Sequence, residues 1–259
     1  MVDIYFYELG VILAGIQEKS LSIKITYWIR NLLSKPLFTA LNGDLGKVLD
    51  IGGGSFYKSL RDSTWTEYVV FEPDVDFLPE MNASRVYSVS GDGLNPPFKS
   101  ETFDTILIIQ VLQFIFEPNL LIKNISKIIK DNGKIIIQVP QSGNLHGIPN
   151  HYYNFTKFWL NRILTENNFE IINHYYLGGA WRTIASRLFL MFWPVFRHKY
   201  YLDPQFKKRG YKFWITFPIQ VLIAGMIFPT ALLLSLFDIK EEANNHLVVA
   251  IKRPSRNYN

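Results

Sequence analysis

The stretch KVLDIGGGSFYKSLRD, residues 47–62, decides the fold, because a short apolar run leads there directly into three glycines. Glycines at the end of a strand let the backbone turn sharply and approach a ligand closely, and the amides at the start of a following helix can face that ligand. We therefore expect a strand over KVLDI and a helix that opens at SFYKSLRD, with Ser55 as its cap.

Apolar strands and helices alternate on the C-terminal side of this stretch. EYVVFEPD predicts a second strand, and the continuously apolar FDTILIIQVLQF predicts a strand buried on both faces of a parallel sheet. Helix-then-strand segments follow at 117–140 and 156–179, the second with Thr156 as its cap, and NHLVVAIKRP returns to a strand. This alternation favours a doubly wound α/β domain, and residues 20–42 predict an amphipathic helix that precedes it.

The composition excludes several classes of protein. The chain has 259 residues, 48% of them hydrophobic, so it can bury the core of one large domain or of a domain with an insertion. It has no cysteine, which excludes disulfides and thiolate metal sites, and its five histidines lack zinc-ligand spacing, so we expect no metal. The N-terminus has neither a basic leader nor a cleavage site, so we expect no signal peptide and a cytoplasmic location.

Two acids follow the glycines at informative distances. Glu72 ends the second expected strand 22 residues after Asp50, a position from which a carboxylate can accept hydrogen bonds from ribose hydroxyls. Asp92 lies in a loop before the strand that starts at FD. A nicotinamide-dependent dehydrogenase would explain Gly52 to Gly54 and Glu72, but not the spacing of Asp92.

With these residues the sequence resembles the class I S-adenosylmethionine-dependent methyltransferases, in the broad subgroup with D-x-G-x-G, an acid ending strand two, and GD…L-P-F…FD. The resemblance covers residues 45–177 and resumes at 245–253. It implies a Rossmann-like, doubly wound, mostly parallel seven-stranded α/β sheet. It also implies S-adenosylmethionine as the cofactor.

The resemblance assigns the first group of cofactor residues. Asp50, Gly52 and Gly54 match the motif that surrounds the methionine part of the cofactor. Glu72 matches the acid that binds its ribose. The alternative, in which the glycines serve only a tight turn and Asp50 only caps a helix, leaves Glu72 and Asp92 unexplained together.

Further cofactor contacts follow from the same resemblance. Asp92 matches the residue that contacts the adenine amino group, with Gly93 beside it, and Gln110 lies where the loop after strand four touches the cofactor. Two positions depart from the pattern: Phe56 replaces the third glycine, and Phe114 replaces a histidine that many relatives have. These departures keep open a scaffold that binds the cofactor without catalysis.

The tetrapeptide Asn95–Phe98, NPPF, resembles the catalytic motif of methyltransferases that act on amines of nucleobases. In those enzymes the motif follows strand four, whereas here it precedes the strand TILIIQVLQF. We therefore expect NPPF to be a turn stiffened by two prolines, with Phe98 packed beneath the sheet edge.

The loop QSGNLHGIPNHYYNFT, residues 141–156, offers candidates for methyl transfer above the expected cofactor site. In relatives an H-x-Y-x-F-T element caps the active site at this point. His151 is our candidate base toward a hydroxyl and Tyr153 our candidate for positioning the substrate. The alternative is that His151 only hydrogen-bonds the loop backbone.

An insertion at 180–240 separates the last two expected strands. Its run Phe213–Phe237 has 25 residues and no charge, which is long enough to cross a bilayer. Between Trp181 and Lys212 there are eight Lys or Arg residues against one acid, a balance of +7, while the rest of the chain balances at −2. The basic residues would face anionic headgroups.

Connectivity limits how this insertion meets a membrane, because strands on both sides of it should join one sheet. We expect it to enter and return, or to lie in the interface, with Pro218 and Pro229 breaking the long run. The alternative is a soluble helical pair that covers the active site or forms a homodimer. A nucleic-acid partner is not expected, since the aromatic residues are mixed with a membrane-length apolar run.

The sequence therefore predicts three parts: a helical cap at 1–44, a methyltransferase domain at 45–179 and 245–253, and the insertion at 180–240. We expect O-methylation of a lipid-associated acceptor, such as a sugar of a surface glycan, on the inner face of the cell membrane. Two alternatives remain open: a soluble small-molecule methyltransferase with a dimerising insertion, and a non-catalytic cofactor-binding scaffold.

Overall fold

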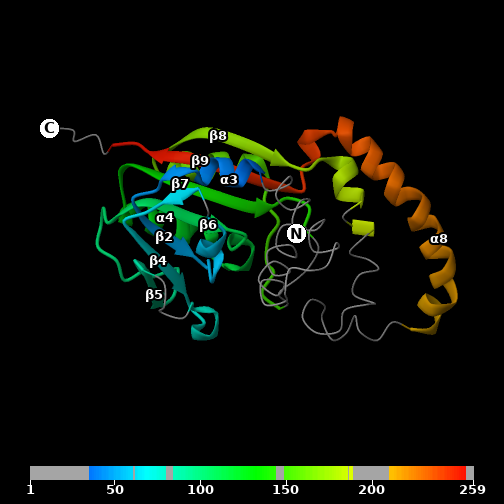
Figure 1. Cartoon of the computed structure of the whole chain (residues 1–259), viewed down its shortest axis with the longest axis horizontal. Coiled ribbons are helices and arrows are strands. Elements are labelled where there is room, and N and C mark those ends of the chain that lie inside the picture. Colours follow the sequence, from blue (N-terminus) through cyan, green and yellow to red (C-terminus); the bar gives the residue numbers. More distant parts are fainter. Residues whose placement is uncertain are drawn as a thin grey trace.

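A seven-stranded sheet in the order β5-β4-β2-β6-β7-β9-β8 runs through the protein (Figure 1). The computed structural model describes residues 35–60, 62–79, 84–143, 149–185, 187–188 and 210–254. The first five strands of this order are parallel, and β9 is antiparallel to both of its neighbours. This confirms the predicted doubly wound, mostly parallel sheet. The strands are β2 (Lys47–Ile51), β4 (Glu67–Glu72), β5 (Val86–Ser90), β6 (Phe103–Ile109), β7 (Ile129–Pro140), β8 (Phe169–Leu177) and β9 (Asn245–Lys252).

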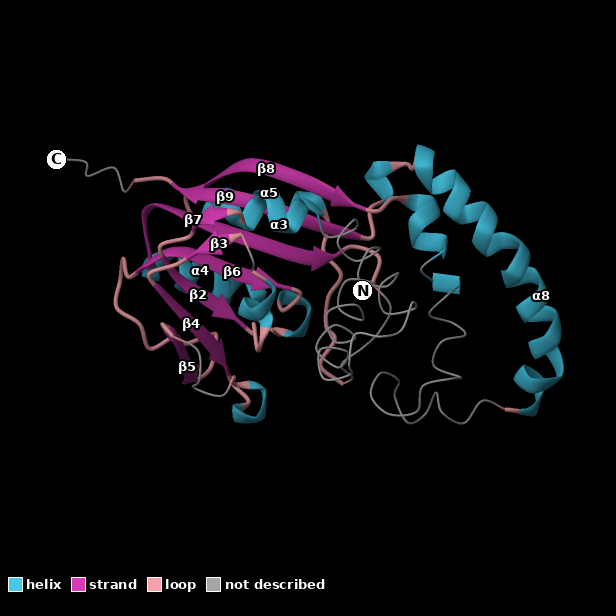
Figure 2. Cartoon of the chain, in the orientation of Figure 1, coloured by secondary structure: helices cyan, strands magenta, loops and turns pink. Residues whose placement is uncertain are grey.

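Helices cover both faces of the sheet because successive side chains of a strand point to opposite faces (Figure 2). Leu49 of β2 belongs to the core cluster that includes residues of α4 (Pro118–Ile128) and α5 (Lys157–Glu166). Val48 belongs to the other cluster, which includes residues of α3 (Lys35–Leu41). The central strands are therefore apolar on both faces, as the run FDTILII predicted.

The prediction of a helix after the glycines is wrong. The chain forms only the 3-10 turn η1 (Phe56–Ser59), and Ser55 makes no capping hydrogen bond with its side chain. The short strand β3 (Ser63–Thr64) already pairs with β1 (Gly43–Asp44), so little chain is left for a longer helix. Phe56 packs into the core. Of the expected helix at 20–42, the structure describes α3, and the remainder of the cap at 1–44 that precedes Lys35 lies outside the described residues.

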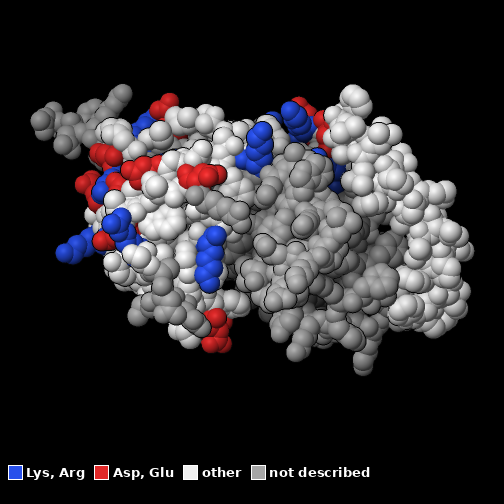
Figure 3. Space-filling model, viewed as in Figure 1, with Lys and Arg blue, Asp and Glu red and all other residues white. Residues whose placement is uncertain are grey.

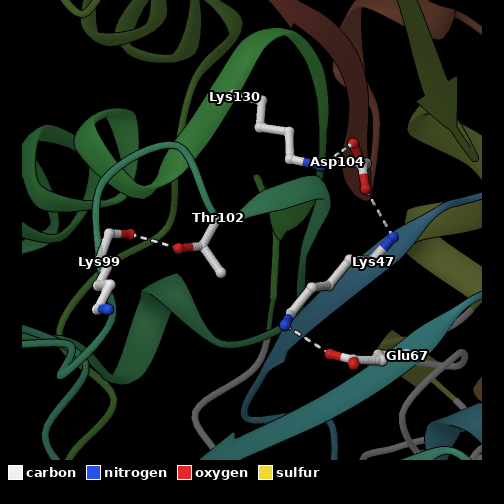
Figure 4. A network of polar contacts seen from close by, with 6 residues as sticks. All are labelled: Lys47, Glu67, Lys99, Thr102, Asp104 and Lys130. Atoms are coloured by element: carbon white, nitrogen blue, oxygen red, sulfur yellow. Dashed lines mark hydrogen bonds and ion pairs between the residues drawn. The ribbon is translucent and has the colours of Figure 1, made fainter.

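A small polar network joins the amino ends of β2, β6 and β7, at the edge of the sheet opposite the glycines (Figure 4). The carboxylate of Asp104 accepts hydrogen bonds from the backbone amide of Lys47, at 2.9 Å, and from the Lys130 ammonium, at 2.8 Å. Burial alone would raise the pKa of Asp104, but the contacts with Lys130 and Lys47 together hold it below its ordinary value. The network is partly exposed, so it aligns the strands more than it stabilises them.

In the part of the insertion that the structure describes, one long helix, α8 (Tyr211–Leu234), stands away from the sheet in Figures 1 and 2. Pro218 and Pro229 both lie inside this helix, so the prediction that they break the run is wrong. Among the described residues, Tyr211–Phe237 is the one helix that could cross a membrane by length and composition, with a mean hydropathy of 2.1 and 11% of it buried. A hydrophobic helical insertion between the last two strands is thus confirmed.

Candidate functional site

The residues predicted to bind the cofactor gather at the carboxyl edge of the sheet. Gly52 follows β2 and donates its backbone N–H to the carbonyl of Phe71 in β4, at 2.9 Å. Gly91 follows β5 and donates to the carbonyl of Glu72, at 3.2 Å. Because these strands are parallel neighbours, their carboxyl ends form a single crevice, which is where ligands bind in open α/β sheets.

The glycine loop is held too closely to carry side chains. Gly52 has φ of +67°, and a Cβ there would lie 2.5 Å from Cγ2 of Val111, which follows β6. A Cβ on Gly53 would lie 1.8 Å from the carboxylate of Asp50. Gly54 has φ of +48°, a conformation that L side chains rarely adopt. The loop therefore presents bare backbone to the crevice.

Asp50 lies beneath this loop with 0% of its surface exposed. Tyr68 donates its hydroxyl to Oδ2 at 2.6 Å, and Oδ1 is buried without a hydrogen-bond partner among the described residues. Burial raises the pKa of Asp50 to about 7. The hydrogen bond from Tyr68 lowers this pKa, and the charge of Glu72 raises it by a smaller amount. Asp50 thus supports the loop from below.

Glu72 and Asp92 lie on the same edge in different settings. Glu72 is half-buried at the end of β4, where burial, and then the charge of Asp74, raise its pKa to about 7. Asp92 is exposed, and its carboxylate accepts the N–H of Leu94 at 2.9 Å, which fixes a turn. Gly93 lies in that turn, where a Cβ would approach Leu121 of α4 to 3.3 Å.

The NPPF segment is the turn that leads into β6. Phe98 lies edge-to-face against Phe71, with ring centroids 5.2 Å apart, and against Phe103, at 5.0 Å. It is partly buried against the core below the sheet edge. The aromatic ring therefore serves packing, as expected.

Gln110 directly follows β6, with φ of +60° and a buried side chain. Its Nε2 donates to Oδ1 of Asn245, the first residue of β9, at 2.8 Å. The backbone carbonyl of Gln110 accepts a hydrogen bond from Nε2 of Gln113, also at 2.8 Å. The backbone carbonyl of Gln113 accepts one from the backbone N–H of Tyr152. Sequence reasoning missed Gln113 and Asn245, although a glutamine inside an apolar run is a signal that could have indicated the first.

The loop that precedes α5 holds the two catalytic candidates. Nε2 of His151 lies 3.2 Å from the carbonyl of Tyr153, and the His151 ring meets Phe114 edge-on at 5.8 Å. The Tyr153 hydroxyl donates to the carbonyl of Phe116 at 2.9 Å. The His151 side chain therefore contacts the backbone of its own loop, and the Tyr153 side chain contacts the backbone of a neighbouring one. His146, the other histidine of this loop, lies outside the described residues.

The carboxyl edge offers the groups that S-adenosylmethionine needs. These groups are the bare backbone at Gly52–Gly54, the half-buried carboxylate of Glu72, and the turn at Asp92, which follows the strand next to that of Glu72. Among the described residues, no group of three or more His, Cys, Asp or Glu could hold a metal ion. The residues present therefore fit this organic cofactor.

The raised pKa values predict how stability depends on pH. Asp50 and Glu72 titrate near pH 7 in the folded chain, against 3.8 and 4.5 ordinarily, so the folded state binds more protons between those limits. The contribution of these two groups to the free energy of unfolding without cofactor should therefore be largest below pH 4 and fall toward pH 7, by at most about 1.4 kcal/mol per pH unit for each group. An Asp50→Asn variant should flatten this slope in urea unfolding at a series of pH values. An unchanged slope would contradict the buried acid.

The comparisons with known proteins agree with the expected methyltransferase fold. A family model described as a methyltransferase domain matches residues 25–174, and no curated protein matches the chain. A putative methyltransferase complexed with the Haloferax volcanii Trm112 activator is 11% identical, with a TM-score of 0.56 over 87% of this chain and 92% of that one.

Two further solved structures share the fold. The [4+2]-cyclase SpnF is 15% identical, with a TM-score of 0.53 over 93% of this chain and 86% of that one. Phosphoethanolamine N-methyltransferase 2 of Haemonchus contortus, in complex with S-adenosyl-L-methionine, is 16% identical, with a TM-score of 0.53 over 88% of this chain and 53% of that one. The chain belongs to the methyltransferase domain family, and it is an S-adenosylmethionine-dependent methyltransferase.

Proposed function

We propose that this methyltransferase acts on an acceptor held at a membrane surface, such as a sugar of a lipid-linked glycan, and that it methylates oxygen. The observation that carries the proposal is where the insertion leaves the sheet. Leu177 ends β8 and pairs with Asn245, which begins β9 and accepts the side-chain hydrogen bond of Gln110. The apolar insertion therefore starts and ends on the edge that carries the proposed cofactor residues.

The apolar surface of α8 supports a bilayer as its surroundings. The less exposed positions follow one stripe that includes Ala224 and Ala231, and large apolar side chains surround the rest of the helix. Such a surface is costly to leave in water, and it suits hydrocarbon on the sides of α8 away from the less exposed stripe. On the face that Figure 3 shows, no charged side chain is visible along α8, although Lys212 lies in its first turn. The large apolar side chains of α8 that are more than half exposed are Tyr211, Trp214, Ile215, Ile219, Leu222, Met226 and Leu233.

The length of α8 also suits a bilayer. At 1.5 Å per residue its 24 residues extend about 36 Å, against about 30 Å of hydrocarbon. Both ends of the insertion join one sheet, so we propose that it enters and returns, with the catalytic domain on the cytoplasmic side. Its basic residues would face anionic headgroups. Of those residues, Arg182, Arg187 and Lys212 are described here and the others lie outside the described residues.

The base of the insertion is fixed to the domain, which would hold the site at the membrane. The carboxylate of Asp238 accepts the backbone amides of Trp181, at 2.8 Å, and Arg182, at 3.3 Å. The guanidinium of Arg187 donates to the carbonyl of Ser142, which follows β7, at 2.9 Å. We accordingly propose the division into a cap at 1–44, a catalytic domain at 45–179 with 245–253, and a membrane insertion at 180–240.

The cofactor supplies an electrophilic methyl group, and the chain has to orient the acceptor and remove a proton. We propose that the ionised carboxylate of Glu72 accepts from the ribose, that Asp92, with Gly93 beside it, contacts the adenine, and that Asp50 supports the glycine loop of Gly52 and Gly54. Gln110 holds the next loop against the cofactor. His151 is the proposed base and Tyr153 the proposed positioning residue.

Membrane association can be tested by fractionation. Full-length chain should sediment with anionic vesicles at moderate salt, while a variant with residues 180–240 replaced by a short turn should stay soluble and still bind S-adenosylmethionine. The replacement is feasible because Leu177 and Asn245 already pair as in a hairpin. Full-length chain that remains in the supernatant as a dimer would favour a soluble enzyme with a dimerising insertion.

The ribose role of Glu72 has a matched control in the same strand. Glu72→Gln should weaken S-adenosylmethionine binding by about tenfold in calorimetry, because a charge-assisted hydrogen bond is lost. Glu67→Gln, at the other end of β4, should leave the affinity unchanged. Wild-type affinity should rise as the pH increases through about 7, since only the ionised Glu72 accepts both hydroxyls. Equal affinities for the two variants would exclude the role.

The role of His151 requires an activity measurement. With a labelled methyl group and fractionated membrane lipids and glycans, His151→Ala should lower turnover by about 100-fold while cofactor affinity is kept. Near-normal turnover would leave His151 only its contact with the Tyr153 carbonyl. Cofactor binding without any labelled product would favour a non-catalytic scaffold.

A further inference from the structure

A cleft of about 590 Å³ opens between the first turns of α4 and α5. One wall comes from the segment 116–120 and the other from 153–156 together with Trp159. The volume lies in the range of small-molecule sites. None of the proposed cofactor residues lines the cleft, so it is separate from the crevice at the glycine loop.

Aromatic side chains form a continuous series at this cleft, and all of them except Tyr152 line it. Phe116 meets Tyr152 edge-on at 5.4 Å, Tyr152 lies 6.3 Å from Tyr153, Tyr153 lies 5.7 Å from Phe155, and Phe155 lies 4.5 Å from Trp159. Phe116 is 68% exposed, whereas Phe155 is buried beneath the series. The outer rings are therefore open to a ligand, and the inner one supports them.

Hydrogen bonds hold these rings in position without a ligand. The Tyr153 hydroxyl donates to the carbonyl of Phe116 at 2.9 Å, which ties the two walls together. The amide of Tyr152 donates to the carbonyl of Gln113 at 2.8 Å. Little ordering is therefore needed on binding.

The polar groups of the cleft are acidic or neutral. Asn154 is engaged with the backbone of Gly143, and Thr156 caps α5. Glu117 and Asn119 line the same cleft, and their side chains make no hydrogen bond to another described residue. No Lys or Arg is among the described residues that line it. The cleft thus offers free hydrogen-bonding groups to a neutral ligand and repels an anion.

We propose that this cleft binds a neutral pyranose ring of the acceptor. The apolar C–H face of a sugar can pack on aromatic rings, while its hydroxyls donate to the Glu117 carboxylate and bond to the Asn119 amide. A hydrocarbon chain would make no use of these two exposed polar groups, and a phosphate would require a cation. This inference rests on the proposed function, because it places the sugar of a glycan acceptor.

Two segments of the chain connect the cleft with the residues of the proposed reaction site. Gln113 donates to the carbonyl of Gln110 at 2.8 Å and accepts from Tyr152 through its own carbonyl. The short segment 110–116 therefore runs from the proposed cofactor edge to the wall of the cleft. The proposed base, His151, lies in the other segment, two residues before Tyr153 of the opposite wall.

Binding of sugars to full-length chain in a detergent without a sugar headgroup tests the proposal. The probes are the methyl glycosides of glucose, galactose, mannose and rhamnose, with methyl glucuronide as the charged counterpart. At least one neutral glycoside should bind, and Phe116→Ala should weaken it about fivefold. Phe158→Ala is the matched control, because Phe158 is 72% exposed on α5 but does not line the cleft.

Glu117 gives a second, independent readout. Methyl glucuronide should bind wild type about fivefold more weakly than methyl glucoside, and Glu117→Gln should bring the two affinities together. Binding of none of the neutral glycosides, equal affinities for Phe116→Ala and Phe158→Ala, or no discrimination against the glucuronide in wild type would each overturn the proposal.

Methyl transfer separates this inference from the function on which it rests. If glycosides bind with the expected variant pattern but no labelled methyl group appears on membrane glycans, the sugar-binding proposal holds and the proposed glycan acceptor is excluded. Methylated glycan produced by Phe116→Ala with wild-type KM would sustain the acceptor and defeat the cleft.

Discussion

The carboxylate of Asp50 occupies the space that a side chain at position 53 would need, and the rest of the proposed site depends on this contact. It brings Gly53 down onto a buried acid, so that the loop of Gly52 to Gly54 turns with bare backbone outward. Tyr68, from the neighbouring strand, donates to the same carboxylate and keeps it in place. Because Glu72 lies on that neighbouring strand as well, its charge is coupled to the acid beneath the loop. The loop, the acid below it and the acid beside it therefore act as one unit.

The parts of the fold that could be predicted are those decided locally. The run FDTILII had to be a strand buried on both faces, since no amphipathic pattern interrupts it, and Thr156 caps α5 as its position indicated. The strand VYSVS was not identified because it lies at the edge of the sheet and is only partly apolar. The prediction of a helix after the glycines was wrong because β3 pairs with β1 soon after the glycines. The residues of that segment alone do not indicate this pairing.

The proposed site divides in the same way. Asp50, Glu72 and Asp92 could be found because each follows a strand at a fixed distance from the glycines. The partnership of Gln110 with Asn245 joins residues 135 positions apart, and nothing in either neighbourhood indicates it. The aromatic series from Phe116 to Trp159 also depends on how two loops meet. Fold alone does not decide the reaction, since one similar structure is named a [4+2]-cyclase, so the acceptor has to be sought in such contacts.

The pairing of Leu177 with Asn245 has a consequence for how the insertion affects stability. Residues 178–244 leave and rejoin the sheet at one point, so to the folded domain they are a single closed loop. The entropy of closing a flexible loop grows only with the logarithm of its length, by about 0.6 kcal/mol for each doubling. Relative to a four-residue turn, this loop costs about 2.5 kcal/mol by that rule. An excursion of this size can therefore be lengthened, shortened or exchanged between related chains while β8 and β9 keep their register.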